Sequence, residues 1–250
     1  MAEHAGKLEG KIAVVTGAGR GIGRAIALAY AREGAAVCCA ARTLEDIETT
    51  VEEIERLGGT GLAAPTDVTD LESVRRMFSL AAESLGGLDI LVINAGGSFD
   101  HLPVEESAPD LWLATLDVNL TGAYYCARTA IPYLRSRGAG KIITIGSGIG
   151  HQGRPSTSSY ACAKAGLWML TRVLAQELWQ YNISVNELVP GPVMTGRVGE
   201  SYARRDDSVF KIDSEWVKQP EDVTPMALFL ATQPDRGPTA QSFSLVRRVG

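Results

Sequence analysis

The chain has 250 residues, of which 45% are hydrophobic and 21% charged, and its formal net charge is −5. These proportions are ordinary for a globular protein, and the length fits one α/β domain. Because Lys and Arg are scattered and the charge balance is acidic, we expect no nucleic-acid-binding surface and instead a small-molecule partner.

The N-terminus carries no targeting signal that we recognise. Glu3, Lys7 and Glu9 interrupt the first ten residues, and nowhere do about 18 consecutive apolar residues occur. We therefore expect a cytoplasmic protein with no membrane partner. The four cysteines show neither metal-ligand nor Cys-x-x-Cys spacing, so we expect reduced, small apolar side chains and no metal site.

Seven short β-rich runs alternate with longer helical patterns along residues 1–250. The first six runs are continuously apolar, as is typical of parallel strands that helices cover on both faces. The sequence therefore predicts a single doubly wound α/β domain with a parallel seven-stranded sheet and helices on both faces. The expected strands are Ile12–Thr16, Val37–Ala41, Leu62–Pro65, Ile90–Asn94, Lys141–Ile145, Ile183–Val189 and Phe243–Val246.

Two later segments have distinct signatures. A helix start signal at Ser107-x-x-Asp110, with Pro109 in the first turn, predicts a long helix toward Arg137 that carries Asn119 in its middle. Residues 194–219 then interrupt the alternation, with room for one short helix. Long excursions in compact domains are often lids or binding loops, and a solvated surface insertion is the alternative.

A glycine-rich turn connects the first strand to the first helix. Ile12–Thr16 is followed by Gly17-Ala-Gly-Arg-Gly21-Ile-Gly23, the strand–turn–helix context of a dinucleotide-binding (Rossmann) fold. Glycine lets the backbone approach a pyrophosphate at a helix N-terminus. The spacing Gly-x-Gly-x-x-Gly fails from Gly17 and from Gly19, whereas Thr-Gly-x-x-x-Gly-x-Gly fits. Alone, the turn would also suit a methyltransferase or a plain connection.

Tyr160 and Lys164 form a candidate proton-transfer pair. Side chains four residues apart lie on one face of a helix. A free phenol has a pKa of about 10, and a cation within ~4–6 Å favours its phenolate. Such a pair taken alone is also common on helix surfaces.

Together with Asn94-Ala95-Gly96, the glycine turn and the Tyr160–Lys164 pair make the chain resemble the short-chain dehydrogenase/reductase family over nearly its whole length, in particular its 3-oxoacyl-carrier-protein reductase-like members. The resemblance implies an NAD(P)-dependent oxidoreductase. It implies cofactor contacts at Gly17, Gly19, Arg20, Gly21, Ile22, Gly23, Arg42, Asp67, Val68, Asn94, Ala95, Gly96, Tyr160, Lys164, Pro190, Gly191, Val193 and Thr195.

The same resemblance implies four catalytic roles. Tyr160 exchanges a proton with the substrate oxygen, and Lys164 holds the ribose hydroxyls and lowers the pKa of the phenol. Ser147 orients and polarises the carbonyl. Asn119, at a local break in its helix, places water in a relay from Lys164. Inert alternatives are a turn-forming serine, a polar helix residue and a solvated lysine.

The turn after the second strand addresses the choice of cofactor. Ala41 stands where relatives that prefer NAD usually carry Asp, and Arg42 and Arg20 could reach a 2′-phosphate. We therefore favour NADP(H) and keep NAD(H) as the alternative.

Two departures from the family pattern concern the C-terminal part. Thr239-Ala240-Gln241 replaces the usual Thr-Gly-Gln, and the C-terminal turn is altered. In the family that end often packs between subunits, so a homo-oligomer is expected but could be a tetramer or a dimer. Glu187 lies between Val185 and Val189 on one face of a strand that should be buried, and it needs a partner or solvent.

We expect an NADPH-dependent reductase of 3-oxoacyl or related ketones. A secondary-alcohol or polyol dehydrogenase is one alternative, and a catalytically silent NADP-binding regulator or scaffold is another. The expected substrate pocket combines residues 97–102, residues 148–156 and the excursion after Met194. Its basic side chains suit an anionic substrate or a phosphopantetheine arm, or simply a solvated lid: His151, Arg154, Arg197, Arg204 and Arg205.

Overall fold

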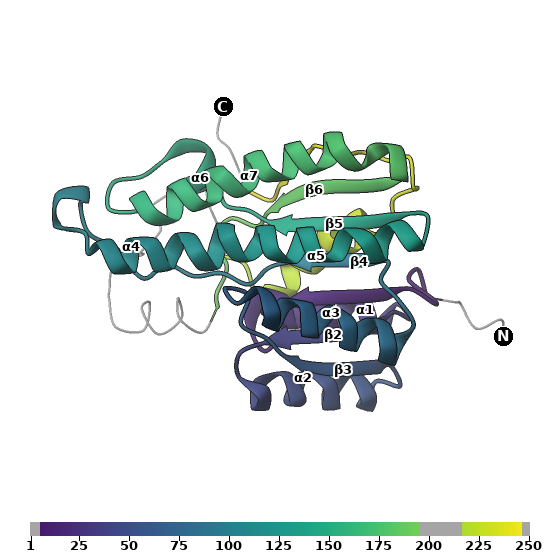
Figure 1. Cartoon of the computed structure of the whole chain (residues 1–250). Helices are drawn as coiled ribbons and strands as arrows, with labels where there is room; N and C mark the ends of the chain where they lie inside the picture. Colours follow the sequence, from purple (N-terminus) through teal and green to yellow (C-terminus); the bar gives the residue numbers. More distant parts are fainter. Residues whose placement is uncertain (1–5, 196–216, 247–250) are drawn as a thin grey trace.

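The computed structural model describes residues 6–195 and 217–246. Within these residues, seven strands form one sheet in the order β3-β2-β1-β4-β5-β6-β7, and every neighbouring pair is parallel. Figure 1 shows the sheet with helices packed against it. The strands are β1 (Ile12–Thr16), β2 (Ala36–Ala41), β3 (Thr60–Pro65), β4 (Ile90–Ile93), β5 (Gly140–Ile145), β6 (Ile183–Val189) and β7 (Ser242–Ser244).

Each face of the sheet packs against its own helices, which confirms the predicted doubly wound fold. One apolar cluster joins α1, α2 and α9 to the sheet, and a second joins α3, α5 and α7 to the other face. The apolar stripe of α1 explains its position, because Ile26 and Tyr30 have no exposed surface. The helices of at least eight residues are α1 (Gly21–Arg32), α2 (Leu44–Arg56), α3 (Leu71–Leu85), α4 (Pro109–Leu116), α5 (Gly122–Ser136), α7 (Ser158–Leu178) and α9 (Thr224–Ala231).

The chain reverses its direction of travel across the sheet between β1 and β4. Strands β2 and β3 lie on one side of β1, and β4 to β7 lie on the other. In open parallel sheets, ligands bind at such a switch point, outside the carboxyl ends of the strands. The loops after β1, β4, β5 and β6 therefore meet where a ligand is expected.

The predicted helix over residues 107–137 is three pieces. Pro109 does occupy the first turn of α4, but Ala108 is the N-cap and the Ser107 side chain does not cap the helix. A π-helical segment, Asp117–Thr121, separates α4 from α5 and contains Asn119. The expected local break at Asn119 is therefore confirmed, whereas the capping interpretation of Ser107 was wrong.

Several strand boundaries differ from the prediction. Strands β2, β3 and β5 begin one or two residues earlier, at Ala36, Thr60 and Gly140, and β4 and β7 differ for reasons of pairing. Strand β4 ends at Ile93, because the Asn94 backbone N–H turns to the Thr16 hydroxyl at 2.9 Å. Strand β7 covers Ser242–Ser244 rather than Phe243–Val246, since it pairs only with Glu187–Val189 of β6. The altered C-terminal turn thus shortens the edge strand.

The excursion after β6 is fastened where it leaves and rejoins the domain. Val193 forms a parallel bridge with Lys218, in which the Met194 N–H donates to the Lys218 carbonyl at 2.7 Å and the Lys218 N–H donates to the Pro192 carbonyl at 3.0 Å. The predicted short helix within residues 194–219 falls largely on residues 196–216, outside the described part. Across the described ranges, no helix is both long and apolar enough to cross a membrane.

Candidate functional site

The glycine turn is locked to the end of β4 by Thr16 and Asn94. The Thr16 hydroxyl accepts from the backbone N–H groups of Asn94 at 2.9 Å and Ala95 at 3.0 Å. The Asn94 side-chain amide in turn donates to the carbonyls of Thr16 at 2.8 Å and Gly17 at 3.3 Å. These bonds join the two strands on either side of the switch point, so the turn and the β4 loop form one wall.

Three positions of the turn accept only glycine for steric or conformational reasons. Gly17 and Gly21 have φ of 68° and 55°, a region that side chains disfavour. A Cβ on Gly23 would overlap the Gly17 carbonyl and the Asn94 amide. A Cβ on Gly21 would lie 3.0 Å from the Thr195 methyl group, so the loop after β6 closes over the same turn.

The start of α1 offers backbone donors at this turn. The N-cap, Arg20, is extended and makes no side-chain cap, so the N–H groups of the first helical turn have no capping side chain. Such a terminus binds anions such as a pyrophosphate. The turn, the Asn94–Ala95 wall and Thr195 thus lie together, an arrangement that suits a dinucleotide.

The neighbourhood of the expected 2′-phosphate contains charges of both signs. Arg20 and Arg42 are exposed beside the ends of β1 and β2. Asp46 from α2 lies against the turn as well, since a Cβ on Gly19 would be 2.6 Å from the Asp46 Cβ. Asp46 was missed in the sequence because it lies four residues beyond the turn after β2.

Tyr160, Lys164 and Ser147 meet at the carboxyl end of β5. The Ser147 side chain faces the Tyr160 hydroxyl and acts to lower its pKa. Ser147 also caps the short helix α6 (Gly148–Gln152), accepting from the Ile149 N–H at 3.3 Å. The Lys164 ammonium lies 5.6 Å from the centre of the Tyr160 ring and donates to the Ile145 carbonyl at 2.8 Å. Both side chains therefore lie at the carboxyl edge of the sheet, where open parallel sheets bind their ligands in a crevice.

The expected lowering of the Tyr160 pKa does not occur in this cofactor-free chain. Burial raises the pKa of Tyr160 above its ordinary 10, and the Ser147 side chain only partly opposes this. Burial also lowers the pKa of Lys164 to about 8, while the charge of Glu187 acts to raise it. Desolvation disfavours the charged form of each group and is the largest influence on both pKa values.

Asn119 lies behind this pair on the π-helical segment. Its side-chain amide donates to the carbonyls of Gly97 at 2.6 Å and Thr115 at 2.8 Å, and its carbonyl accepts from the Gly97 N–H at 3.3 Å. Gly96 separates it from the lysine, since a Cβ there would be 2.5 Å from the Asn119 carbonyl oxygen and 3.7 Å from the Lys164 nitrogen. Asn119 thus orders the β4 loop.

The remaining predicted contacts line the crevice from its two ends. Asp67 closes a turn after β3, where its carboxylate accepts from the Thr69 N–H at 2.9 Å and the Thr69 hydroxyl at 2.7 Å. Val68 is buried and packs against the backbone of Gly122. On the other side, Gly191 has a φ of 71°, which fits the Pro190-Gly191 turn after β6.

Sequence reasoning missed several residues that hold the site. Thr16 belongs to the Thr-Gly motif that the sequence analysis identified, so its role at the site could have been predicted from that motif. The Ile145 carbonyl gives no side-chain signal. His151 and Glu187 were each noticed separately, but a contact across 36 residues cannot be inferred from one sequence.

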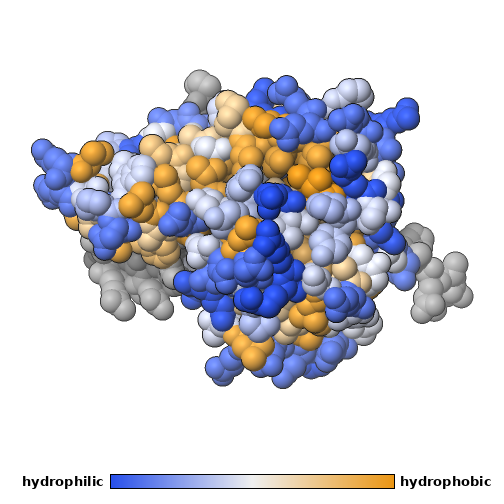
Figure 2. Space-filling view, viewed as in Figure 1, coloured by the Kyte–Doolittle hydropathy of each residue, from blue (hydrophilic) through white to orange (hydrophobic). Residues whose placement is uncertain are grey.

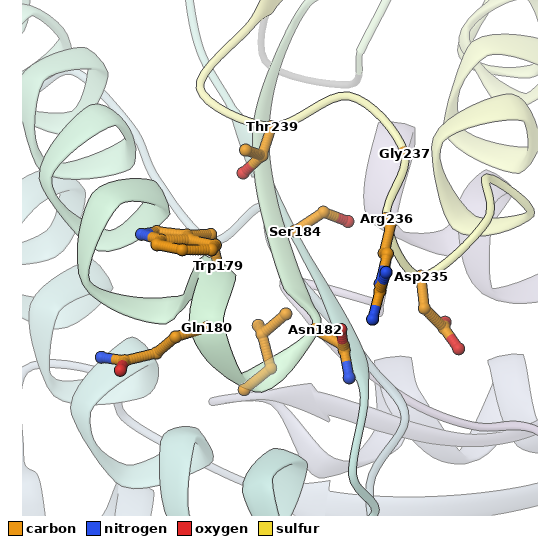
Figure 3. Close-up of a pocket in the computed structure, with 9 residues that line it drawn as sticks. Trp179, Gln180, Asn182, Ser184, Asp235, Arg236, Gly237 and Thr239 are labelled. Carbon is orange, nitrogen blue, oxygen red and sulfur yellow. The ribbon is translucent and has the colours of Figure 1, made fainter.

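A separate pocket lies at the opposite edge of the sheet. It has a volume of about 580 Å³ and surrounds the amino end of β6 (Figure 3). Its carboxylate, Asp235, lies 3.5 Å from the Lys141 ammonium and is thereby paired. No residue predicted for catalysis or cofactor binding lines it, so we place the chemistry at the carboxyl edge. The lining residues are Trp179, Gln180, Asn182, Ile183, Ser184, Asp235, Arg236, Gly237 and Thr239.

Comparisons with known proteins agree with this geometry. The family model described as short chain dehydrogenase matches residues 11–206. A 3-oxoacyl-[acyl-carrier-protein] reductase of Thermotoga maritima is 34% identical over 238 residues, which cover 94% of this chain and 96% of the relative.

Solved structures share the whole fold. A carveol dehydrogenase from Mycobacterium avium in complex with NAD superposes with a TM-score of 0.88 at 29% identity, covering 96% of this chain and 97% of that one. An NAD⁺-bound xylitol dehydrogenase has a TM-score of 0.89 at 26% identity, covering 97% and 100%. The likeness therefore extends from the first strand to the C-terminal edge.

Proposed function

Because the chain belongs to the short-chain dehydrogenase/reductase family and is an NAD(P)-dependent oxidoreductase acting on CH–OH or C=O groups, we propose that it reduces a ketone to a secondary alcohol with NADPH. The observation that carries the proposal is that Tyr160, Lys164 and Ser147 lie together at the carboxyl end of β5, with the Lys164 ammonium 5.6 Å from the centre of the Tyr160 ring. Burial raises the pKa of Tyr160, so the phenol holds its proton at neutral pH. A group in that state is ready to donate to a carbonyl oxygen.

Each polar side chain has one task in this reaction. Ser147 orients and polarises the carbonyl, and Tyr160 gives its proton to the oxygen as negative charge develops there. Lys164 binds the ribose hydroxyls and stabilises the phenolate that the proton transfer leaves. Asn119 fixes the β4 loop that walls the crevice. When bound, the nicotinamide supplies the hydride.

We propose 3-oxoacyl compounds as the first substrate class to test. The relative from Thermotoga maritima supports this choice, since it carries the name 3-oxoacyl-[acyl-carrier-protein] reductase at 34% identity. Arg154 is exposed near the crevice, whereas His151 is engaged with Glu187. The other basic candidates, Arg197, Arg204 and Arg205, lie outside the described residues.

We favour NADP(H) over NAD(H) because Arg20 and Arg42 border the expected 2′-phosphate and no acidic residue ends β2. Asp46 lies against the same turn and opposes this preference. The two effects can be separated by measuring the dissociation constants of both reduced cofactors for the wild type, Arg42→Ala and Asp46→Asn. Arg42→Ala should weaken NADPH binding about tenfold, the effect of one lost charge contact, and should leave NADH unchanged.

A polyol or secondary-alcohol dehydrogenase is the second candidate function. The NAD⁺-bound xylitol dehydrogenase with the same fold supports it. A silent regulator or scaffold is disfavoured because Ser147, Tyr160 and Lys164 are all present and meet at one crevice.

One assay tests direction and substrate together. Purified protein is supplied with NADPH or NADH and a panel of ketones and 3-oxoacyl thioesters, and with the oxidised cofactors and a panel of sugar alcohols. Absorbance of the reduced nicotinamide reports turnover. Faster turnover of a 3-oxoacyl thioester with NADPH than of any alcohol at pH 7 is expected, and the reverse order refutes the proposed direction.

We further propose a homo-oligomer, either a tetramer or a dimer, with no membrane or nucleic-acid partner. Apolar residues gather over α5 and α7 on the face shown in Figure 2. Leu113 on α4, Tyr124 on α5 and Met169 on α7 are each about half exposed. Light scattering during size-exclusion chromatography measures the assembly. The four free cysteines support a reducing, cytoplasmic location.

A further inference from the structure

Glu187 places a carboxylate inside the domain, directly behind the candidate site. It lies on β6 and has no exposed surface. Burying an unpaired carboxylate is costly, so such a group is retained only where partners surround it. Its neighbours therefore indicate what the charge does.

Two side chains from distant elements hold this carboxylate. His151 on α6 places its Nε2 at 2.9 Å and 3.2 Å from the two carboxylate oxygens. The Ser242 hydroxyl on β7 donates to one of the same oxygens at 2.5 Å. The Nε2 tautomer of His151 that carries a proton satisfies the pair. A carboxylate fixed in this way cannot swing out to solvent.

The carboxylate also occupies space that a side chain at position 146 would need. A Cβ on Gly146 would overlap a carboxylate oxygen of Glu187. Gly146 stands between Ile145, whose carbonyl accepts from the Lys164 ammonium, and Ser147, which faces Tyr160. The anion therefore lies under the backbone segment that holds both polar groups of the site.

Charged and titratable groups on α6 and α7 face this anion. On α7, Lys164 faces the same region, and the negative charge of Glu187 acts to raise the pKa of Lys164, which burial has lowered to about 8. On α6 the facing titratable group is His151; β7 contributes only the uncharged Ser242, and β5 contributes Gly146. Lys164 is thus the amine on which the buried charge acts.

We propose that Glu187, fixed by His151 and Ser242, is a positioning residue that keeps Lys164 in its ammonium form. This inference rests on the proposed function, because Lys164 has its role in the reaction of that same crevice. Glu187 touches neither substrate nor cofactor. It acts through Lys164, and through Lys164 on the proton of Tyr160.

The proposal differs from a packing role in one measurable property. Glu187→Gln keeps the size of the side chain and can still bond His151 and Ser242, but it removes the charge. A packing role predicts that the protonation of Lys164 stays the same. The proposal predicts that Lys164 loses its proton at a lower pH.

The test is the titration of Lys164 in the cofactor-free protein, followed by NMR of ¹³C-labelled lysine and assigned with Lys164→Arg. The midpoint should fall by about one pH unit in Glu187→Gln, the lower end of the usual effect of one nearby opposite charge. From a midpoint of about 8 in the wild type, that shift would lower the ammonium fraction at pH 8 about fivefold. An unchanged midpoint overturns the proposal.

A matched control removes a different buried carboxylate. Asp89 is buried at the opposite sheet edge, where it pairs with Arg137 at 3.1 Å. Asp89→Asn should leave the Lys164 midpoint in place. If both variants shift it equally, the effect comes from a loosened fold and the proposal fails.

Two outcomes separate this inference from the proposed function. If Glu187→Gln does not fold, the pair Gly146→Ala with Glu187→Ala supplies a methyl group in the vacated space, and the same midpoint is measured. A shifted midpoint in a protein that turns over no ketone supports the charge role and refutes the reductase. A constant midpoint in a protein that reduces ketones supports the reductase and refutes the charge role of Glu187.

Discussion

Two tyrosines allow a catalytic hydroxyl to be distinguished from a structural one by the same substitution. Tyr160→Phe removes a hydroxyl that faces Ser147 at the crevice. Tyr30→Phe removes a hydroxyl that donates to the Ala227 carbonyl at 2.9 Å inside the core. Each variant keeps its aromatic ring, so packing changes little in either.

The expected effects are opposite in kind. Tyr160→Phe should lower kcat about 10²- to 10⁴-fold, the usual contribution of a positioned acid, while stability falls by less than about 1 kcal/mol because its hydroxyl lies at the crevice. Tyr30→Phe removes a buried hydrogen bond to the Ala227 carbonyl, which costs about 0.5–1.5 kcal/mol. For a chain of this length that is a fall in Tm of roughly 1–6 °C.

Three measurements are made on the wild type and both variants. Tm is followed by circular dichroism, NADPH affinity by nicotinamide fluorescence, and kcat with the best ketone of the panel at a temperature well below every Tm. NADPH affinity should stay close to that of the wild type in both variants. Near-normal kcat in Tyr160→Phe, or an equal loss of kcat in Tyr30→Phe, would refute the assignment of Tyr160.

Three further predictions concern pH, the C-terminal turn and the glycine turn. Burial lowers the folded-state pKa of Lys164 to about 8, from the ordinary 10.5, so its ammonium form is lost as pH rises through about 8. NADPH affinity, measured by fluorescence, should therefore fall above that pH in the wild type. It should not fall in Lys164→Arg, because the guanidinium keeps its charge. Ala240 has a φ of 59°, so Ala240→Gly should raise the free energy of unfolding by up to about 1 kcal/mol, and a loss seen in urea denaturation contradicts the assigned strain. Gly23→Ala forces a methyl group against Gly17 and Asn94 and should destabilise the protein by about 1–3 kcal/mol. An unchanged Tm and an unchanged NADPH affinity would show that the turn can accommodate a methyl group at position 23.

The sequence predicted the fold well because its signals are local and repeated. Continuous apolar runs gave the first six strands, and residues such as Ile26 and Tyr30 marked the buried side of α1. The order of the strands within the sheet was not predicted and comes from the structure. The exceptions are boundaries, such as the end of β4, where a bond from the Asn94 N–H to Thr16 overrides strand propensity.

Electrostatics at the site was the part that sequence reasoning could not supply. Spacing placed Tyr160 and Lys164 on one helix face, and the structure puts the ammonium 5.6 Å from the ring centre. The direction of the Tyr160 pKa depends on desolvation, which the whole fold sets. The partner of Glu187 was equally hidden, since His151 reaches it only through the packing of α6 against the sheet.

The bridge between Val193 and Lys218 has a consequence for how this scaffold can diversify. Its two backbone hydrogen bonds hold the ends of the intervening 24 residues at one place beside the crevice. The entropy of closing a loop grows slowly, by only about 0.6 kcal/mol for each doubling of length. Residues could therefore be inserted or deleted between the two anchors while the hydroxyl and amine chemistry stays intact, which lets selectivity evolve apart from catalysis.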